Sequence, residues 1–311
     1  MSDGWPVRLV GRDLPALQGP LTPRRRAVRD GLFLAGMMFL LNLFLRVAPS
    51  AGTVGFDAYS YWRVDLADPY RGAIGSLGWF PYSPALAQIA SLFDILPWTT
   101  FLWFWLALLV GTIIWLGGTR TLWLLAFPPV AIELYHGNIN LLIAAAIVLG
   151  FRYPAAWSFV ILAKVTPGIG LLWFAVRREW RSLAIALGTT TVLAGISIVA
   201  VPELWTQWSG ALVGSANASP DPSIDILPLW ARLPLAAAIV AWGARTDRRW
   251  TVPVAATVAM PVLWFAVPAV LAAVLPLLPG ADGHRFRVPG LLRRVLPVRH
   301  SPERETAKAA L

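Results

Sequence analysis

The sequence predicts an all-α protein, a polytopic helical bundle with about ten membrane segments. Of its 311 residues, 57% are hydrophobic and only 14% are charged, and the mean hydropathy is +0.63. Soluble globular domains carry about 25% charged residues. The chain has no cysteine, which excludes a disulfide framework, a thiolate zinc site and a cysteine nucleophile. These observations exclude a disordered chain, a disulfide-stapled module and an ordinary soluble α/β enzyme.

Six apolar stretches are long enough, or nearly so, for the roughly 20 residues that a membrane helix needs. They are 31–48, 83–97, 99–118, 153–176, 182–201 and 227–243. Two longer apolar stretches, 121–150 and 250–279, are interrupted over 133–140 and 260–264. Non-helical backbone at membrane depth needs protein or a water-filled cavity to satisfy its polar groups. We therefore predict that each long stretch is a broken pair of short helices.

Arginine clusters predict the orientation of these segments. They precede the first span, follow the sixth and eighth segments, and recur after the tenth: Arg24, Arg25, Arg26 and Arg29; Arg177, Arg178 and Arg181; Arg245, Arg248 and Arg249; Arg285, Arg287, Arg293, Arg294 and Arg299. An even number of segments separates the clusters, so all of them fall on the cytoplasmic side. The loops 49–82 and 202–226 then lie outside, and both lean acidic. We interpret the net charge of +10 as topology and not as nucleic-acid binding.

Composition divides the chain into one membrane domain and two extensions. Residues 1–28 and 281–311 are rich in Arg, Pro and Gly, and we expect both to be basic cytoplasmic extensions. Residues 29–280 form the single transmembrane domain. The expected location is the plasma membrane, in contact with membrane lipids, with both ends of the chain in the cytoplasm.

Lys164 lies inside the predicted span 153–176, where a charged group costs roughly 2.5–3.5 kcal/mol on insertion scales. Pro167 interrupts the helix three residues later. One interpretation is a structural ion pair of Lys164 with Glu133 or Asp94. The other is a cation that faces a cavity and receives an anionic ligand such as a lipid phosphate.

Two amides, Asn138 and Asn140, begin the second helix of the first broken pair, and His136 precedes them. Asn138 suits an N-cap, which alone would explain it. A helix N-terminus at membrane depth also offers N–H groups to an anion or to a sugar hydroxyl. His136 either serves the same cavity or is an ordinary interior histidine.

The first external loop is unusually rich in aromatic side chains. Asp57 follows the first span closely, and Phe56, Tyr59, Tyr61 and Trp62 surround it; Arg71, Trp79 and Tyr82 lie further along. A lone aspartate in a loop is usually solvated. The aromatic neighbourhood, typical of a membrane interface, favours a carboxylate that is held in place.

Other familiar site chemistries are missing from the sequence. It has no Walker A motif, no GxGxxG after a strand and no HExxH. Its three histidines, at 136, 284 and 300, do not suffice for a histidine-rich metal site. We therefore predict neither a metal nor a cofactor.

The order of these motifs resembles glycosyltransferase family 87, also called the DUF2029 proteins, of the GT-C fold class. The resemblance covers roughly 55–280 and rests on five stretches: Gly55 to Asp57, Pro81 to Pro84, Gly137 to Asn140, Lys164 to Pro167 with the basic turn 177–181, and Pro261 to Trp264. Each motif alone is weak, and their order and spacing carry the resemblance. Many members have a histidine after the last motif, where this chain has Phe265 and Ala266.

The resemblance implies a mannosyltransferase-like enzyme that uses a polyprenyl-phosphate-linked sugar and modifies a lipid or glycan acceptor on the outer face. Asp57 is the expected general base, and one essential base fits an inverting reaction. The expected substrate-binding residues are Lys164, Asn138, Asn140, His136, Tyr82, Arg71 and Trp264. Lys164 and the 137–140 turn would stabilise the departing phosphate.

Two other classes of protein fit the same features. A transporter or lipid flippase also uses broken helices and an intramembrane lysine, although we find no internal pseudo-symmetry. A catalytically silent scaffold with the same fold is the third possibility, because the histidine after Trp264 is missing.

Overall fold

The computed structural model describes residues 22–216 and 227–279, and this part of the chain is helical without any strand. The predicted all-α class is therefore confirmed. Most of the two predicted extensions lies outside the described residues. Helix α1 begins at Pro23, with Thr22 as its N-cap, so residues 23–28 of the first extension are helical.

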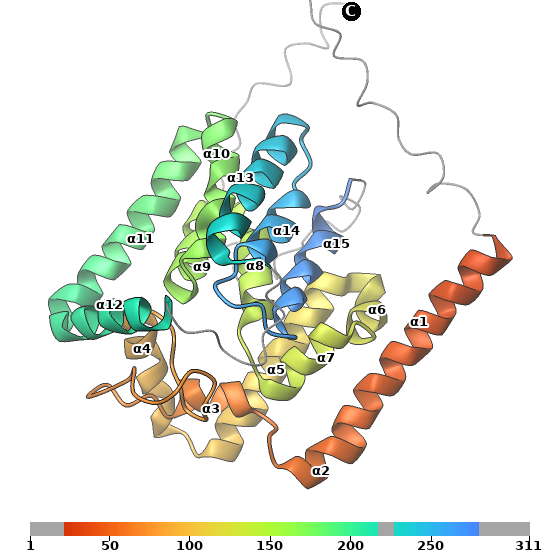
Figure 1. The fold of residues 1–311 in the computed structure, drawn as a ribbon, viewed down its shortest axis with the longest axis horizontal. Coiled ribbons are helices and arrows are strands. Elements are labelled where there is room, and N and C mark those ends of the chain that lie inside the picture. Colours follow the sequence, from red (N-terminus) through yellow and green to blue (C-terminus); the bar gives the residue numbers. More distant parts are fainter. Residues whose placement is uncertain (1–21, 217–226, 280–311) are drawn as a thin grey trace, which may run out of the picture.

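Three helices of the described chain are long and apolar enough to cross a membrane (Figure 1). The first is α1 (Pro23–Asn42), which continues through η2 (Leu43–Val47) and α2 (Ala48–Ala51). The second is α5 (Trp98–Gly117), which η4 (Gly118–Arg120) joins to α6 (Thr121–Leu125), and the third is α11 (Trp180–Ala200). They match the predicted spans 31–48, 99–118 and 182–201.

Both predicted broken pairs have their breaks at the expected place. Helices α7 (Pro128–His136) and α8 (Asn140–Gly150) meet at 113°. Helix α14 (Thr251–Val258) ends before the Pro261 region, and the chain resumes as η7 (Val267–Ala273) and α15 (Val274–Leu277). By length and composition the described residues hold three spans, or four with the bent α7–α8 pair, so the number of ten stays a prediction.

The predicted span 153–176 is interrupted, as Pro167 indicated, and it is a series of short helices and not one long helix. It consists of η5 (Pro154–Ala156), α9 (Trp157–Ala163), η6 (Thr166–Leu171) and α10 (Leu172–Val176). Lys164 interrupts it in an extended conformation, with φ −146° and ψ 117°. Pro167 lacks an N–H group and its ring clashes with a helical carbonyl four residues earlier, which explains the break. The remaining apolar helices are α4 (Pro84–Ala90) with η3 (Ser91–Ile95), and α13 (Leu229–Arg245).

Two segments predicted as external loops contain helices. Helix α3 (Phe56–Trp62) carries Asp57 in its first turn, and α12 (Pro202–Ala216) begins just after α11. Figure 1 shows α12 lying across the end of α11, on the side of the molecule that also holds α3 and α4. Residues 217–226 of the second predicted loop lie outside the described residues.

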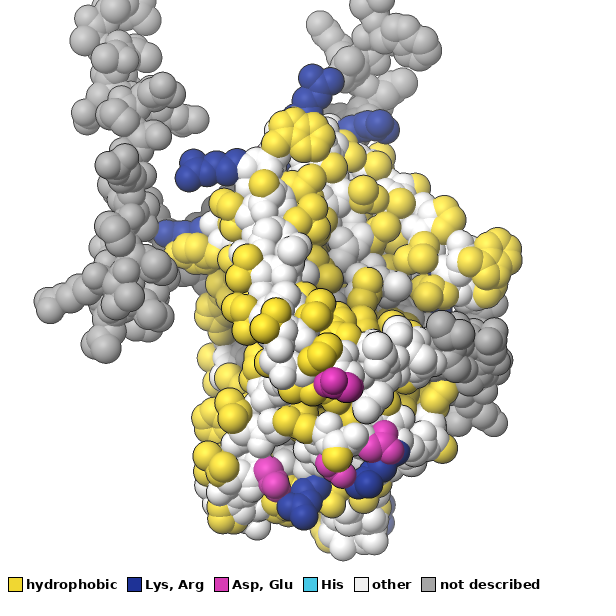
Figure 2. Space-filling view, turned by 90° about the vertical axis from the view of Figure 1, so that its left-hand side faces the viewer, with side chains coloured by type: hydrophobic (Ala, Val, Ile, Leu, Met, Phe, Trp, Pro, Cys, Tyr) yellow, Lys and Arg dark blue, Asp and Glu magenta, His cyan; other side chains and the backbone are white. Residues whose placement is uncertain are grey.

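The surface has the polarity of a membrane protein. Exposed apolar side chains of α11 include Val192, Ile196 and Val199. In Figure 2 apolar side chains cover the middle of this face and Lys and Arg lie at both ends, whereas the visible Asp and Glu side chains lie only towards the lower end. This arrangement matches a helix bundle with an apolar belt between two polar ends.

Arg232 is a buried cation that the sequence analysis overlooked inside the predicted span 227–243. Its side chain in α13 is 4% exposed. The guanidinium donates hydrogen bonds to the carbonyl oxygens of Leu227 at 2.8 Å, Val258 at 3.1 Å, Met260 at 2.6 Å and Pro261 at 3.2 Å. Arg232 therefore satisfies backbone groups that the break after α14 leaves without helical partners.

We predict that Arg232→Met destabilises the protein by about 3 kcal/mol, because several buried carbonyl groups lose a charge-assisted hydrogen bond. Thermal unfolding of the purified protein in detergent measures the change. Arg245→Met, at the exposed end of the same helix, is the control and should leave the unfolding temperature unchanged. Equal effects of the two substitutions would contradict the anchoring role of Arg232.

Candidate functional site

The bend between α7 and α8 is built around a buried carboxylate. Glu133 and Asn140 are both 0% exposed. One oxygen of Glu133 accepts from the side-chain amide of Asn140 at 2.9 Å, and the other accepts from the backbone N–H of Leu141 at 3.0 Å. Gly137, with φ 69°, turns the chain between the two helices. Glu133 thus ties the end of α7 to the first turn of α8.

This geometry corrects the predicted N-cap. The N-cap position of α8 is Ile139, and the side-chain oxygen of Asn138 accepts from the backbone N–H of Ile139 at 2.7 Å. Because Glu133 occupies the N–H of Leu141, that group is not free to bind an anion. The helix N-terminus therefore does not offer this N–H group to a ligand.

Lys164 reaches the same buried pair from the end of α9. Its amino group donates to the side-chain oxygen of Asn140 at 3.0 Å. Asn140 therefore stands between Lys164 and Glu133, as a neutral bridge between the two ionisable groups. The other suggested partner is wrong, since Asp94 pairs with Arg63 at 2.8 Å.

Asp57 joins this network from α3. The side-chain amide of Asn138 donates to its carboxylate at 2.7 Å. The start of α3 is fixed by a hydrogen bond from the Gly55 N–H to the carbonyl of Tyr135 at 2.9 Å. Its end is fixed by a bond from the Trp62 indole to the carbonyl of Leu96 at 2.8 Å. Asp57 is therefore held on a tethered helix and is not a solvated loop residue.

The polar cluster that results comprises Asp57, Glu133, His136, Asn138, Asn140 and Lys164. The Asn140 amide also lies 3.3 Å from the side-chain oxygen of Asn138, so polar contacts run unbroken from Asp57 to Lys164. Glu133 and Asn140 are buried, whereas the other four side chains are partly exposed. The cluster thus has a buried centre and a partly exposed rim.

The electrostatic setting of Asp57 suits a proton acceptor. Burial raises the pKa of its carboxyl above the ordinary 3.8. The hydrogen bond from Asn138 and the nearby His136 and Lys164 oppose that rise. A carboxylate with a raised pKa holds a proton more strongly than an exposed one, which improves it as a general base.

Two tyrosines extend the cluster on the side of α3. The hydroxyls of Tyr61 and Tyr82 share a hydrogen bond of 2.7 Å, and both rings are buried. Burial raises the pKa of both phenols well above the ordinary value, and the charge of Asp57 contributes. Both hydroxyls therefore stay protonated. Sequence reasoning named Tyr61 only as an interface aromatic and not as a site residue, although its position four residues after Asp57 places both on one face of a helix.

The remaining predicted site residues are only partly brought together. His136 belongs to the cluster, and its ring lies 6.2 Å from that of Phe56. Arg71 is exposed and pairs with Asp65 at 3.4 Å, so the structure does not place it in the cluster. Trp264 is partly buried at the second break. Within the described ranges, no three His, Asp or Glu side chains are grouped to hold a metal ion.

Comparison with known proteins gave one finding. Residues 79–287, most of the chain, match the family model of glycosyltransferase family 87. The match includes Asn138, Asn140, Lys164 and Trp264 and begins after Asp57. No curated protein and no solved structure matches the chain.

We predict that Gly137→Ala disturbs the bend and displaces α3. A Cβ atom at this position would lie 2.8 Å from the Cβ of Ala58, and φ 69° is unfavourable for alanine. The free energy of unfolding should fall by about 2 kcal/mol. Thermal unfolding measures this. The control is Gly188→Ala in α11, where a Cβ meets no atom within 4 Å and the added methyl should be neutral or stabilising.

Proposed function

The chain belongs to glycosyltransferase family 87 and is a membrane glycosyltransferase, and from this we propose a specific reaction. The enzyme transfers a hexose, by family analogy mannose, from a polyprenyl-phosphate donor to a lipid or glycan acceptor. We further propose a GT-C-like domain over 29–280 with about ten membrane segments, between basic extensions at 1–28 and 281–311. It needs no metal or cofactor.

The observation that carries this proposal is the contact chain from Asp57 to Lys164. An aspartate on a short helix outside the long spans and a lysine at a break between helices meet through Asn138 and Asn140. Glycosyl transfer from a phosphate donor needs a base at the acceptor hydroxyl and positive charge at the departing phosphate. The polar cluster supplies both groups in one place.

The proposed step is a single displacement. The carboxylate of Asp57 takes the proton of the acceptor hydroxyl while the hydroxyl oxygen attacks C1 of the donor sugar. The bond between C1 and the phosphate oxygen breaks, and polyprenyl phosphate leaves with the electron pair. Lys164 and the amide of Asn138 stabilise the charge that develops on this phosphate, and the buried Asn140 positions the amino group of Lys164. Glu133, the other carboxylate of the cluster, is fully buried and both its oxygens accept hydrogen bonds. With one accessible base and no accessible carboxylate as nucleophile, we propose that the configuration at C1 inverts.

The distribution of charge supports an outward-facing site in the plasma membrane. Arg177 and Arg181 lie at the end of the molecule opposite α12, near the α10–α11 turn (Figure 1). Asp57 and α3 lie at the α12 end. Since basic residues favour the cytoplasmic side, the proposed cluster faces outside. His136, Tyr82 and Trp264 remain proposed substrate contacts. We no longer assign this role to Arg71, because Arg71 pairs with Asp65 instead.

We predict that Asp57→Asn lowers the rate of sugar transfer by about 10²–10⁴-fold, the usual contribution of a positioned general base. The amide keeps the size of the side chain, so the protein should still insert and unfold at a similar temperature. The assay follows labelled polyprenyl-phosphate mannose and glucose into product with the purified protein in liposomes.

Asp68→Asn is the matched control for this experiment. Asp68 is an exposed carboxylate in the same external segment, and its substitution should leave the rate unchanged. Full turnover by Asp57→Asn would remove Asp57 from the mechanism. Movement of the donor across the membrane without any glycosylated product would instead identify a carrier.

The pH dependence gives a second prediction. Asp57 must be ionised to accept a proton, so activity falls as the pH drops through its pKa, which burial raises above 3.8. Asn138→Ala removes a hydrogen bond that lowers this pKa. The acid limb of the pH–rate profile should therefore move to higher pH in this variant. The pH–rate profile of Asp68→Asn is the reference. If the acid limb of Asn138→Ala coincides with that of the reference, a group other than Asp57 controls the fall in activity.

A further inference from the structure

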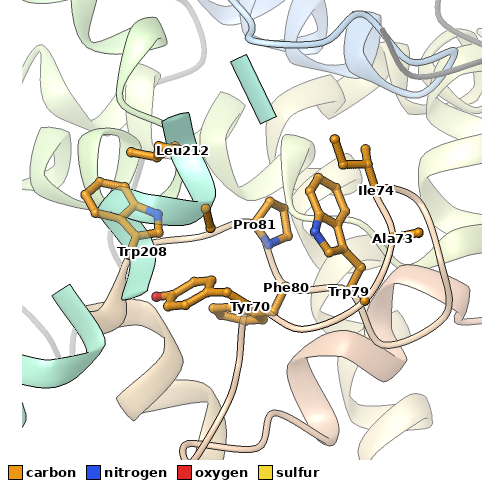
Figure 3. Close-up of a pocket in the computed structure, with 10 residues that line it drawn as sticks. Tyr70, Ala73, Ile74, Trp79, Phe80, Pro81, Trp208 and Leu212 are labelled. Carbon is orange, nitrogen blue, oxygen red and sulfur yellow. The ribbon is translucent and has the colours of Figure 1, made fainter. Parts of the chain in front are cut away.

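A concave site lies between the segment 70–81 and α12. This cavity of about 300 Å³ is lined by four aromatic residues and six non-aromatic ones. We call it the aromatic pocket and define it by Tyr70, Trp79, Phe80, Pro81 and Trp208. Figure 3 shows Pro81 between the indole rings of Trp79 and Trp208, with Leu212 of α12 above Trp208.

The walls of the aromatic pocket are fixed in place. The indole N–H of Trp205 donates to the hydroxyl of Ser197 in α11 at 3.1 Å, and its ring contacts that of Trp208 edge-on at 5.5 Å. The hydroxyl of Tyr70 donates to the carbonyl of Tyr82 at 3.2 Å. Rings that are held before a ligand arrives lose little freedom when it binds.

One polar group of the pocket wall has no partner among the described residues. The indole nitrogen of Trp208 is buried and makes no hydrogen bond there, although a buried indole N–H usually finds an acceptor. In Figure 3 this nitrogen is on the side of the ring that faces Pro81. A ligand with both a face for aromatic rings and oxygen acceptors at its edge therefore complements the site.

The position of the pocket connects it to the proposed reaction. Its wall residue Pro81 directly precedes Tyr82, whose hydroxyl meets that of Tyr61 on the helix of Asp57. A Cβ at Gly75, in the loop that leads to wall residue Trp79, would lie 3.7 Å from Trp264, a proposed substrate contact. The loop 70–81 therefore connects the aromatic pocket to the helix that carries Asp57 and to Trp264.

We propose that the aromatic pocket binds a pyranose ring of the acceptor, so that the acceptor hydroxyl belongs to a glycan or the sugar of a glycolipid. Pyranose C–H groups stack on aromatic faces, and ring hydroxyls accept from an indole N–H. The volume is at the lower end for small-molecule sites and is too small for a long polyprenyl chain. This inference rests on the proposed transferase reaction and names its acceptor class.

Saturation-transfer NMR with methyl α-mannoside, methyl α-glucoside and methyl α-galactoside tests the proposal on the full chain in a sugar-free detergent. At least one of these glycosides should receive saturation from the wild-type protein. Trp208→Ala and Trp79→Ala should weaken its binding by about tenfold, as for a central tryptophan contact. Trp180→Ala, an exposed tryptophan of α11, should leave binding unchanged, and unfolding temperatures verify that each variant is folded.

Trp208→Phe keeps a ring but removes the N–H group, so it should weaken binding less than Trp208→Ala does. It should raise the KM for the acceptor and leave the KM for the donor unchanged. The proposal would be overturned if the wild type bound none of the glycosides or if all variants bound them equally. Saturation transfer to farnesol but to none of the glycosides would also overturn it. Asp57→Asn should still bind the glycoside; if it both binds and transfers sugar, only the assignment of the base fails.

Discussion

The buried contact between Glu133 and Asn140 is the interaction on which the candidate site depends. It closes the bend between α7 and α8, and it orients Asn140 towards Lys164. Asn138, next to this pair, then faces Asp57. A buried carboxylate without hydrogen-bond partners would be costly, and here each of its oxygens accepts one bond. The requirement to satisfy one buried charge thus fixes the positions of the side chains at the rim.

Much of the fold was predictable, because membrane helices and their interruptions leave a local signal. Long apolar runs predicted α1, α5 and α11, and Pro261 and the 137–140 turn predicted where two stretches break. The short helices were not predictable in the same way. Helix α3 has seven residues, and α12 contains polar residues throughout, so neither shows an apolar run of spanning length. Their helical state depends on packing against distant segments.

The candidate site shows the same division between local and long-range information. Polar residues in apolar surroundings drew attention to Lys164, Asn138 and Asn140, and the structure brings them together. The sequence did not indicate which charged side chains pair with one another. Asp94 pairs with Arg63 and not with Lys164, and Arg71 pairs with Asp65. Arg232 escaped notice because its partners are backbone carbonyls on a segment 26 to 29 residues away. Such contacts follow from the tertiary fold and leave no pattern in the sequence near the arginine.

The tethers of α3 have a consequence for how such an enzyme diversifies. Helix α3, which carries Asp57, is hydrogen-bonded to α7, to Leu96 and to Tyr82. The aromatic pocket, in contrast, is formed by the loop 70–81 and one face of α12. Reactive groups and the proposed recognition surface therefore occupy different structural units. Related enzymes can then evolve new acceptor preferences by exchanging the loop or α12 while the reactive groups are inherited unchanged, and protein engineers can graft these two elements in the same modular way.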